Sequence, residues 1–127
     1  NQSSDFEPIS QQTLFDARQQ VLAVHMAESV EEYLVQIILA TRNTQAHGGD
    51  LENWLDYGAS PRATIALDRC SRALAWLDNR DYVTPDDIRA VAHDVLRHRL
   101  ILSFEAEAAG ITANQVIDKL LTTLPSA

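Results

Sequence analysis

The chain has 127 residues, a hydrophobic fraction of 46% and a formal net charge of −8, with four glycines, four prolines and one cysteine. This length is typical of a single domain with its own core, and the composition excludes a disordered chain, a strand-rich sandwich and an internal disulfide. The acidic balance argues against nucleic acid as a partner, because phosphate backbones attract clusters of Lys and Arg. No apolar stretch reaches the roughly 18 residues of a membrane span, so we expect no membrane insertion and a cytoplasmic location.

The N-terminal part combines a polar leader with a first predicted helix. Residues 1–9 are expected to form a flexible leader or an interdomain linker, and residues 10–127 to form the helical domain. Ser10 is a good N-cap, and apolar residues follow it at helical spacing. The apolar stripe of this helix comprises Leu14, Ala17, Val21 and Val24.

The second predicted helix begins at Ser29, with Glu32 three residues later as a capping box, and ends near Asn43. Its buried face is expected to comprise Val30, Tyr33, Leu34, Ile37, Ile38 and Thr41. Residues 44–57 then form the longest irregular segment of the chain. One short helical turn is expected there, at Leu51, Trp54 and Leu55.

Residues 58–63 predict the start of a third helix, which is expected to run from Pro61 to about Leu77. Gly58 can adopt backbone angles closed to other residues, Ser60 is a good N-cap, and Pro61 suits the first helical position. Small alanines would let a neighbouring helix approach closely, so we expect this helix to be central. Its buried residues are predicted to be Ala66, Leu67, Cys70, Ala73, Leu74 and Leu77.

A fourth helix is predicted by Thr84, which is followed by a proline and by the acidic first turn Asp86–Asp87. Cations at 97–99 close this helix at its negative end, and residues 100–102 form an apolar connector that is either extended or helical. The apolar side of the helix comprises Ile88, Val91, Ala92, Val95 and Leu96.

The last predicted helix follows a break at Gly110 and begins with a capping box of Thr112 and Gln115. Pro125 is expected to stop it. Its apolar side comprises Val116, Ile117, Leu120, Leu121 and Leu124. Together these signals predict an all-α fold, a compact bundle of about five helices around one core.

Arg62 is the residue whose position is most informative about function. It lies in the first turn of the third helix, beside free N–H groups, where a cation is mildly disfavoured by the helix itself. An anion bound at this helix start would make the position favourable for a cation. Ser60 and Pro61 would then lie next to the anion. The alternative interpretation is a solvated arginine that happens to follow a good cap.

Other chemistry finds little support in the sequence. No glycine-rich phosphate loop precedes Lys119, the histidines form no metal-binding pair, and no serine lies in a nucleophile elbow, so neither a metal site nor nucleophilic catalysis is predicted. The pair Asp86–Asp87 is explained by helix capping. The aromatics Trp54, Tyr57 and Trp76 more readily form a satellite core than a base-stacking platform, although one of them could lie beside a nucleotide base.

Three segments in this order resemble the C-terminal lid of MoxR-type AAA+ ATPases: residues 58–63 (GASPRA), 80–87 (RDYVTPDD) and 95–100 (VLRHRL). The resemblance continues through residues 102–112 and covers nearly the whole chain after the polar leader. It implies that Arg62 matches the sensor 2 arginine, which reaches from the lid toward the γ-phosphate of ATP on a preceding P-loop domain.

The resemblance further implies a hexameric ring and a chaperone-like role in maturing client complexes, often beside proteins with von Willebrand factor A domains. ATP and Mg²⁺ would be cofactors of the parent protein, because this chain has neither Walker A nor Walker B. Alone it is expected neither to hydrolyse ATP nor to bind it tightly.

A second function stays open from the sequence. The chain could instead be a stand-alone acidic helical module for protein–protein interaction, in which Arg62 is merely exposed and an uncovered helix face binds a partner. A small helical enzyme that uses His93 and His98 is a more distant alternative. A P-loop sequence upstream of Asn1 would favour the lid.

Overall fold

A computed structural model describes residues 10–42 and 53–124 of the chain. Within these residues the fold is mostly helical, as predicted, with a short antiparallel ribbon β1–β2 added. The helices are α1 (Gln11–Leu22), α2 (Glu28–Arg42), α4 (Pro61–Leu77), α5 (Pro85–Leu96), α6 (Phe104–Ala108) and α7 (Ala113–Thr123). The strands are β1 (Leu55–Tyr57) and β2 (Ile101–Leu102).

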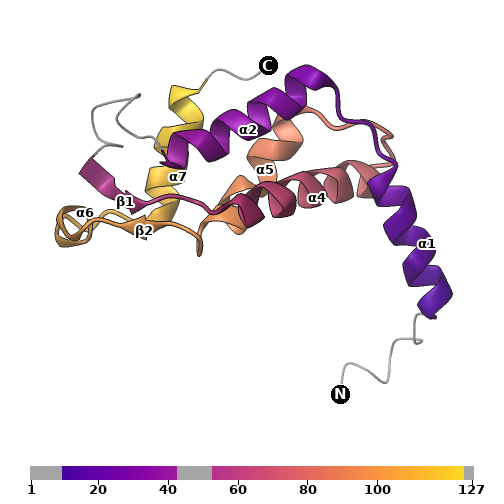
Figure 1. The fold of residues 1–127 in the computed structure, drawn as a ribbon, viewed down its shortest axis with the longest axis horizontal. Coiled ribbons are helices and arrows are strands. Elements are labelled where there is room, and N and C mark those ends of the chain that lie inside the picture. The colour runs from indigo at the N-terminus through magenta and orange to yellow at the C-terminus, as the bar shows by residue number, and fades with distance from the viewer. Residues whose placement is uncertain (1–9, 43–52, 125–127) are drawn as a thin grey trace.

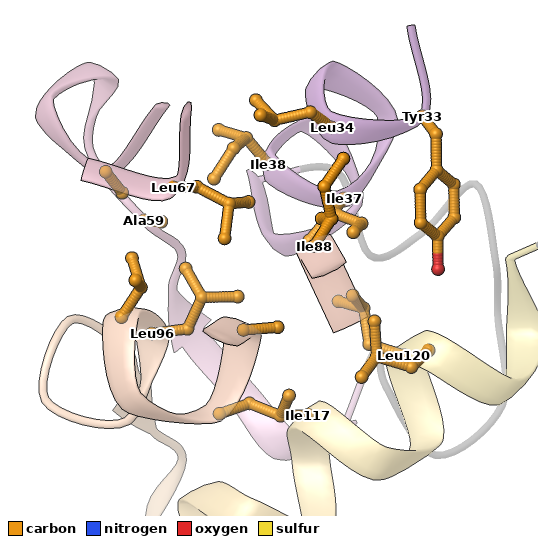
Figure 2. Close-up of a cluster of buried hydrophobic side chains, with 14 of the residues drawn as sticks. Tyr33, Leu34, Ile37, Ile38, Ala59, Leu67, Ile88, Leu96, Ile117 and Leu120 are labelled. Atoms are coloured by element: carbon orange, nitrogen blue, oxygen red, sulfur yellow. The ribbon is translucent and has the colours of Figure 1, made fainter. Parts of the chain in front are cut away.

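The core lies between α2, α4, α5 and α7, and Figure 1 shows α1 at one end of the long axis and the ribbon with α6 at the other. Large side chains from all four helices meet in it, as Figure 2 shows for Ile37, Leu67, Ile88 and Ile117. Each of these four is fully buried. The single predicted core is therefore confirmed. None of the described helices is long and apolar enough to cross a membrane.

The predicted caps are mostly confirmed. Ser10 accepts a hydrogen bond from the Thr13 N–H at 3.0 Å, and the capping boxes of Thr84 with Asp87 and of Thr112 with Gln115 both form. Gly110 has a φ of +78°, in the left-handed region that favours glycine, so it breaks the chain as expected. Pro125 lies outside the described residues.

The capping box predicted at Ser29 is wrong. Helix α2 begins one residue earlier, at Glu28, and the Ala27 carbonyl accepts the N–H groups of Val30 and Glu31 at 3.0 and 2.9 Å. Glu28 and Glu31 both lie in the first turn, where acidic side chains complement the helix dipole without a side-chain cap. The predicted buried face of α2 is confirmed in full.

The apolar stripe of α1 is covered only toward the C-terminal end of the helix. Leu14 is 53% exposed, Ala17 and Val21 are half-buried, and Val24, just after the helix, is buried. Helix α1 projects from the bundle and packs against α4 alone among the major helix pairs (Figure 1), so the described part of the chain offers its first turns nothing to pack on.

The bounds of α4 agree with the prediction, but its buried face agrees only at Leu67 and, in part, at Ala66. The buried residues are Ala63, Leu67, Ser71 and Ala75, whereas Cys70 is exposed and Leu77 is 69% exposed. Apolar residues occur on every side of this helix, so the pattern could not fix its rotation. The small residues spaced by four let α5 pack closely on α4, which is central as predicted.

The irregular segment before α4 ends in a strand. Leu55 pairs with Leu102 in the ribbon, so the predicted helical turn does not include Leu55, and the connector at 100–102 is extended. Leu51 lies outside the described residues. The ribbon continues in two hydrogen bonds, from the Ser103 N–H to the Trp54 carbonyl at 2.9 Å and from the Ser103 hydroxyl to the Asn53 carbonyl at 2.6 Å.

Helix α6 was not predicted from the sequence. Ser103 is its N-cap and accepts a hydrogen bond from the Ala106 N–H at 3.0 Å. Only Ala106 of its five residues is buried, and Phe104 is 84% exposed, so the segment has no apolar periodicity. The cap alone was the available signal.

Candidate functional site

The candidate site is the start of α4, where the sequence placed Ser60, Pro61 and Arg62. Ser60 is the N-cap with extended backbone angles and Pro61 is the first helical residue, as predicted. The Ser60 side chain, however, makes no capping hydrogen bond. The Ser60 carbonyl instead accepts the Ala63 N–H at 2.9 Å. The helix start must therefore be held in place by contacts other than its own cap.

Those contacts come from the end of α2. The Ala59 N–H donates to the Thr41 hydroxyl at 2.9 Å, and the Thr41 hydroxyl donates to the Ile38 carbonyl at 2.7 Å. Thr41 and Ala59 are 2% and 1% exposed. On the other side of Arg62, Ala63 is fully buried in the core. The backbone on both sides of Arg62 is thus anchored.

Gly58 completes this contact. A Cβ atom at residue 58 would lie 2.0 Å from the Thr41 carbonyl oxygen and 2.8 Å from the Arg42 nitrogen. No side chain fits there, because the loop backbone passes directly against the last turn of α2. From the sequence, we explained Gly58 by the backbone angles that glycine can adopt. The structure shows another reason, which is that the loop backbone approaches α2 too closely for any Cβ atom.

Arg62 itself is exposed, and its guanidinium makes no hydrogen bond or ion pair with any described residue. Most other arginines of the described chain do: Arg72 pairs with Asp68, Arg80 with Asp87 and Arg97 with Asp94. The site therefore consists of an exposed guanidinium on a fixed backbone at a helix N-terminus. Such an arrangement can bind an anion that approaches from outside the domain.

The predicted aromatic neighbours do not all lie near this site. Trp76 is near the far end of α4, about 21 Å from Arg62 at 1.5 Å per residue, and its indole N–H donates to Gln20 of α1 at 3.0 Å. Trp54 packs against the main hydrophobic core and does not form a separate satellite core. Trp76 packs there as well, so neither is a free stacking platform.

The histidines likewise build no common site. The His93 ring lies 2.7 Å from the Asp118 carboxylate, which links α5 to α7, and His98 is exposed beyond the end of α5. Within residues 10–42 and 53–124, no three His, Cys, Asp or Glu side chains gather in a way that could hold a metal ion. His47 lies outside the described residues.

The sequence reasoning missed an ion pair next to a predicted cap. Arg80 donates two hydrogen bonds to Asp87, each of 2.7 Å, and the Thr84 N–H donates to the same carboxylate at 2.8 Å. Burial alone would raise the pKa of Asp87, but the hydrogen bonds from Arg80 and Thr84 outweigh it and lower that pKa below 3.8. The Asp87 carboxylate in turn raises the pKa of the Arg80 guanidinium.

Comparison with known proteins defines the class. Residues 52–120 match the AAA lid domain family, so this chain belongs to that family. A solved structure of a candidate ATPase from Cytophaga hutchinsonii superposes with a TM-score of 0.89 at 39% identity, over 94% of this chain and 36% of that one. The family match and the superposed structure both agree with the predicted helical lid fold.

The curated relatives narrow the class further. The chain is 42% identical to the chaperone MoxR1 of Mycobacterium tuberculosis over 73% of its length, and 32% identical to the protein MoxR of Paracoccus denitrificans over 80%. It spans 25% and 32% of those two proteins. It is the C-terminal lid domain of a MoxR-type AAA+ ATPase.

Proposed function

We propose that this lid closes over ATP bound on a preceding P-loop domain and that Arg62 is its sensor 2 arginine. One observation carries the proposal: Arg62 is exposed and unpaired among the described residues, while the backbone on both sides of it is anchored. A guanidinium offers a planar fork that matches phosphate oxygens, and the start of α4 adds positive potential beside it.

The chemistry follows from where charge develops during hydrolysis. As the γ-phosphoryl group is transferred to water, negative charge grows on its oxygens, and a contact from Arg62 stabilises that charge. When the phosphate leaves, Arg62 loses its partner and the lid is free to rotate. Nucleotide state is thereby converted into domain movement. Mg²⁺ and the remaining phosphate contacts would come from the P-loop domain.

Helix α1 supports the presence of an adjoining domain. It follows residues 1–9 directly and exposes two large apolar side chains, Leu14 at 53% and Phe15 at 54%. Exposed apolar residues on a projecting helix are typical of a surface that another part of the protein covers. We propose that the preceding P-loop domain covers it.

The assembly and the client belong to the parent protein. We propose that the parent forms a hexameric ring and acts as a chaperone-like factor in maturing client complexes, with von Willebrand factor A domain proteins as partners. The relative in Mycobacterium tuberculosis is itself called a chaperone, which supports this role.

ATP hydrolysis by the full-length protein tests the role of Arg62. Arg62→Ala should lower kcat by about a hundredfold or more, the usual effect of removing one donor to a transition-state oxyanion. Arg62→Lys should recover only part of the rate, because an ammonium lacks the planar fork. Arg69→Ala is the matched control: Arg69 is also exposed on α4, about two turns further on, and its loss should leave hydrolysis near wild type.

Normal turnover in Arg62→Ala would contradict the proposal. That result would favour the alternative function, a stand-alone acidic helical module for protein–protein interaction. In that case an uncovered face such as α1 would be the binding surface.

A further inference from the structure

Thr41 is a buried polar residue whose hydroxyl joins two separate elements. It receives the Ala59 N–H from the loop before α4 and donates to the Ile38 carbonyl within α2. Two other buried side chains of the described residues carry a hydroxyl. Ser71 donates to the Leu67 and Asp68 carbonyls of its own helix, and Tyr33 accepts a hydrogen bond from the Arg89 guanidinium of α5. Of these three, Thr41 is the one whose hydroxyl bonds to the loop before α4, where Arg62 lies.

We propose that Thr41 is a positioning residue for Arg62: its hydroxyl holds the Gly58–Ala59 backbone against the last turn of α2 and so fixes the origin of the Arg62 side chain. The proposal rests on the proposed sensor 2 role of Arg62. Under this proposal, a residue of α2 helps to position a side chain of α4.

The first step is that the loop has no side-chain cap at the start of α4, so the Thr41 hydroxyl is the acceptor that its buried N–H depends on. Ser60 occupies the N-cap but its side chain makes no capping hydrogen bond, so α4 lacks the usual anchor at its start. The Ala59 N–H is buried, and without the Thr41 hydroxyl it would have no acceptor. A buried N–H is satisfied almost without exception, so the loop would move to find another acceptor.

The second step is that this contact lies close to Arg62 along the chain. Arg62 is three residues from Ala59 and one residue before the fully buried Ala63, so a shift of the loop moves the Cα of Arg62 directly. Gly58 keeps the loop within contact of the Thr41 carbonyl, where a Cβ would be only 2.0 Å away. Figure 2 shows Ala59 among the core side chains, and its hydrogen bond to Thr41 is buried.

The third step is the sensitivity of phosphoryl chemistry to position. A misplacement of about 1 Å can cost about a hundredfold in rate even when every group remains present. A change in Thr41 should therefore lower kcat without removing any group that touches the nucleotide. A residue that only stabilises the fold would not produce that selective loss.

The test uses the full-length protein and a matched pair of substitutions. Thr41→Val keeps the shape of the side chain but removes the hydroxyl, and we expect kcat for ATP hydrolysis to fall about tenfold or more. Thr41→Ser keeps the hydroxyl and should restore most of the rate. Ser71→Ala removes a buried hydroxyl that bonds only within its own helix, and it should leave kcat near wild type, even if it lowers the melting temperature.

The combination with Arg62→Ala isolates the mechanism. If Thr41 acts through Arg62, Thr41→Val should have no further effect on kcat once Arg62 is alanine, because the group being positioned is gone. Thr41→Ala also removes the hydroxyl, and it adds no methyl group beside the buried Ala59 N–H. It should lower kcat as Thr41→Val does, and it serves as the second variant if Thr41→Val fails to fold.

The outcomes separate this inference from the proposed function. Normal turnover in Arg62→Ala overturns both. A strong loss in Arg62→Ala with wild-type kcat in Thr41→Val, or in Thr41→Ala, overturns the positioning role alone. Equal losses in Ser71→Ala and Thr41→Val, or additive losses in the double variant, also overturn it, because either result would mean that Thr41 acts through the stability of the lid.

Discussion

At the scale of single residues, Arg80 and Arg62 differ in whether the folded lid supplies a partner for the guanidinium. Arg80 is committed to Asp87 by two hydrogen bonds of 2.7 Å, and its guanidinium also lies 5.9 Å from the ring centroid of Tyr82. Arg62 makes no such contact with the described residues. The sequence RDYVTPDD therefore belongs to the structure of the lid, whereas the arginine in GASPRA is available for function.

Asp87 should contribute strongly to stability because it satisfies three groups at once: both Arg80 nitrogens and the Thr84 N–H. Asp87→Ala should lower the free energy of unfolding by about 2 kcal/mol, the cost of losing a cap and a charge-assisted pair that is partly solvated. Its neighbour Asp86 is exposed, and Asp86→Ala should change that free energy by less than about 0.5 kcal/mol. Urea denaturation measures both. Equal effects would contradict the account.

The same carboxylate predicts a dependence on pH. The pKa of Asp87 is lower in the folded chain than its ordinary value of 3.8, so the folded state binds this proton less readily than the unfolded state. The contribution of Asp87 is thus fully present above about pH 3.8 and is lost as the pH falls through the folded pKa. The stability gap between wild type and Asp87→Asn should shrink in that range. A gap that is constant down to about pH 2 would show that the pair does not depend on the charge.

At the scale of elements, the sequence predicted helix existence and caps well and helix rotation poorly. Ser10, Thr84 and Thr112 mark true helix starts, because a side-chain oxygen that caps a helix is a local event. The buried face of α4 was misplaced because apolar residues surround that helix. The ribbon could not be foreseen, since Leu55 and Leu102 pair across a long stretch of sequence.

The rotation of α4 can be tested directly. Ala75 is fully buried, so Ala75→Leu should overfill the space beside the neighbouring helices and lower the free energy of unfolding by about 1–3 kcal/mol. Leu77 is 69% exposed, and Leu77→Ala should change it by less than about 0.5 kcal/mol. Thermal denaturation of the two variants measures both losses of stability. The opposite order would mean that the predicted face, with Leu77 inside, is the correct one.

The candidate site was predicted from the sequence only in part. Arg62, Ser60 and Pro61 occupy the positions expected of them, because a proline after a serine is a strong local signal for a helix start. The contribution of Thr41 was not foreseen. Its hydroxyl meets Ala59 across 18 residues, and part of the intervening chain has no regular pattern that would fix the path.

At the scale of the whole molecule, the chain is a folded unit, and Arg62, the residue proposed for function, has no partner among the described residues. The core of α2, α4, α5 and α7 is complete, and Figure 1 shows α1 projecting from it. The relatives of MoxR type are about three to four times longer than the matched part, since this chain spans 25% to 36% of them. A P-loop domain in the rest of the parent protein, facing both Arg62 and α1, would explain why Arg62 has no partner among the described residues and why α1 exposes apolar side chains.

The most direct measurement is a structure of the full-length protein with a non-hydrolysable ATP analogue. The account predicts that the Arg62 guanidinium lies within hydrogen-bond distance, about 2.7–3.2 Å, of an oxygen of the terminal phosphate. It also predicts that the contact between Thr41 and Ala59 is retained in that state. A closed lid in which Arg62 points to solvent, while another cation contacts the terminal phosphate, would contradict the account.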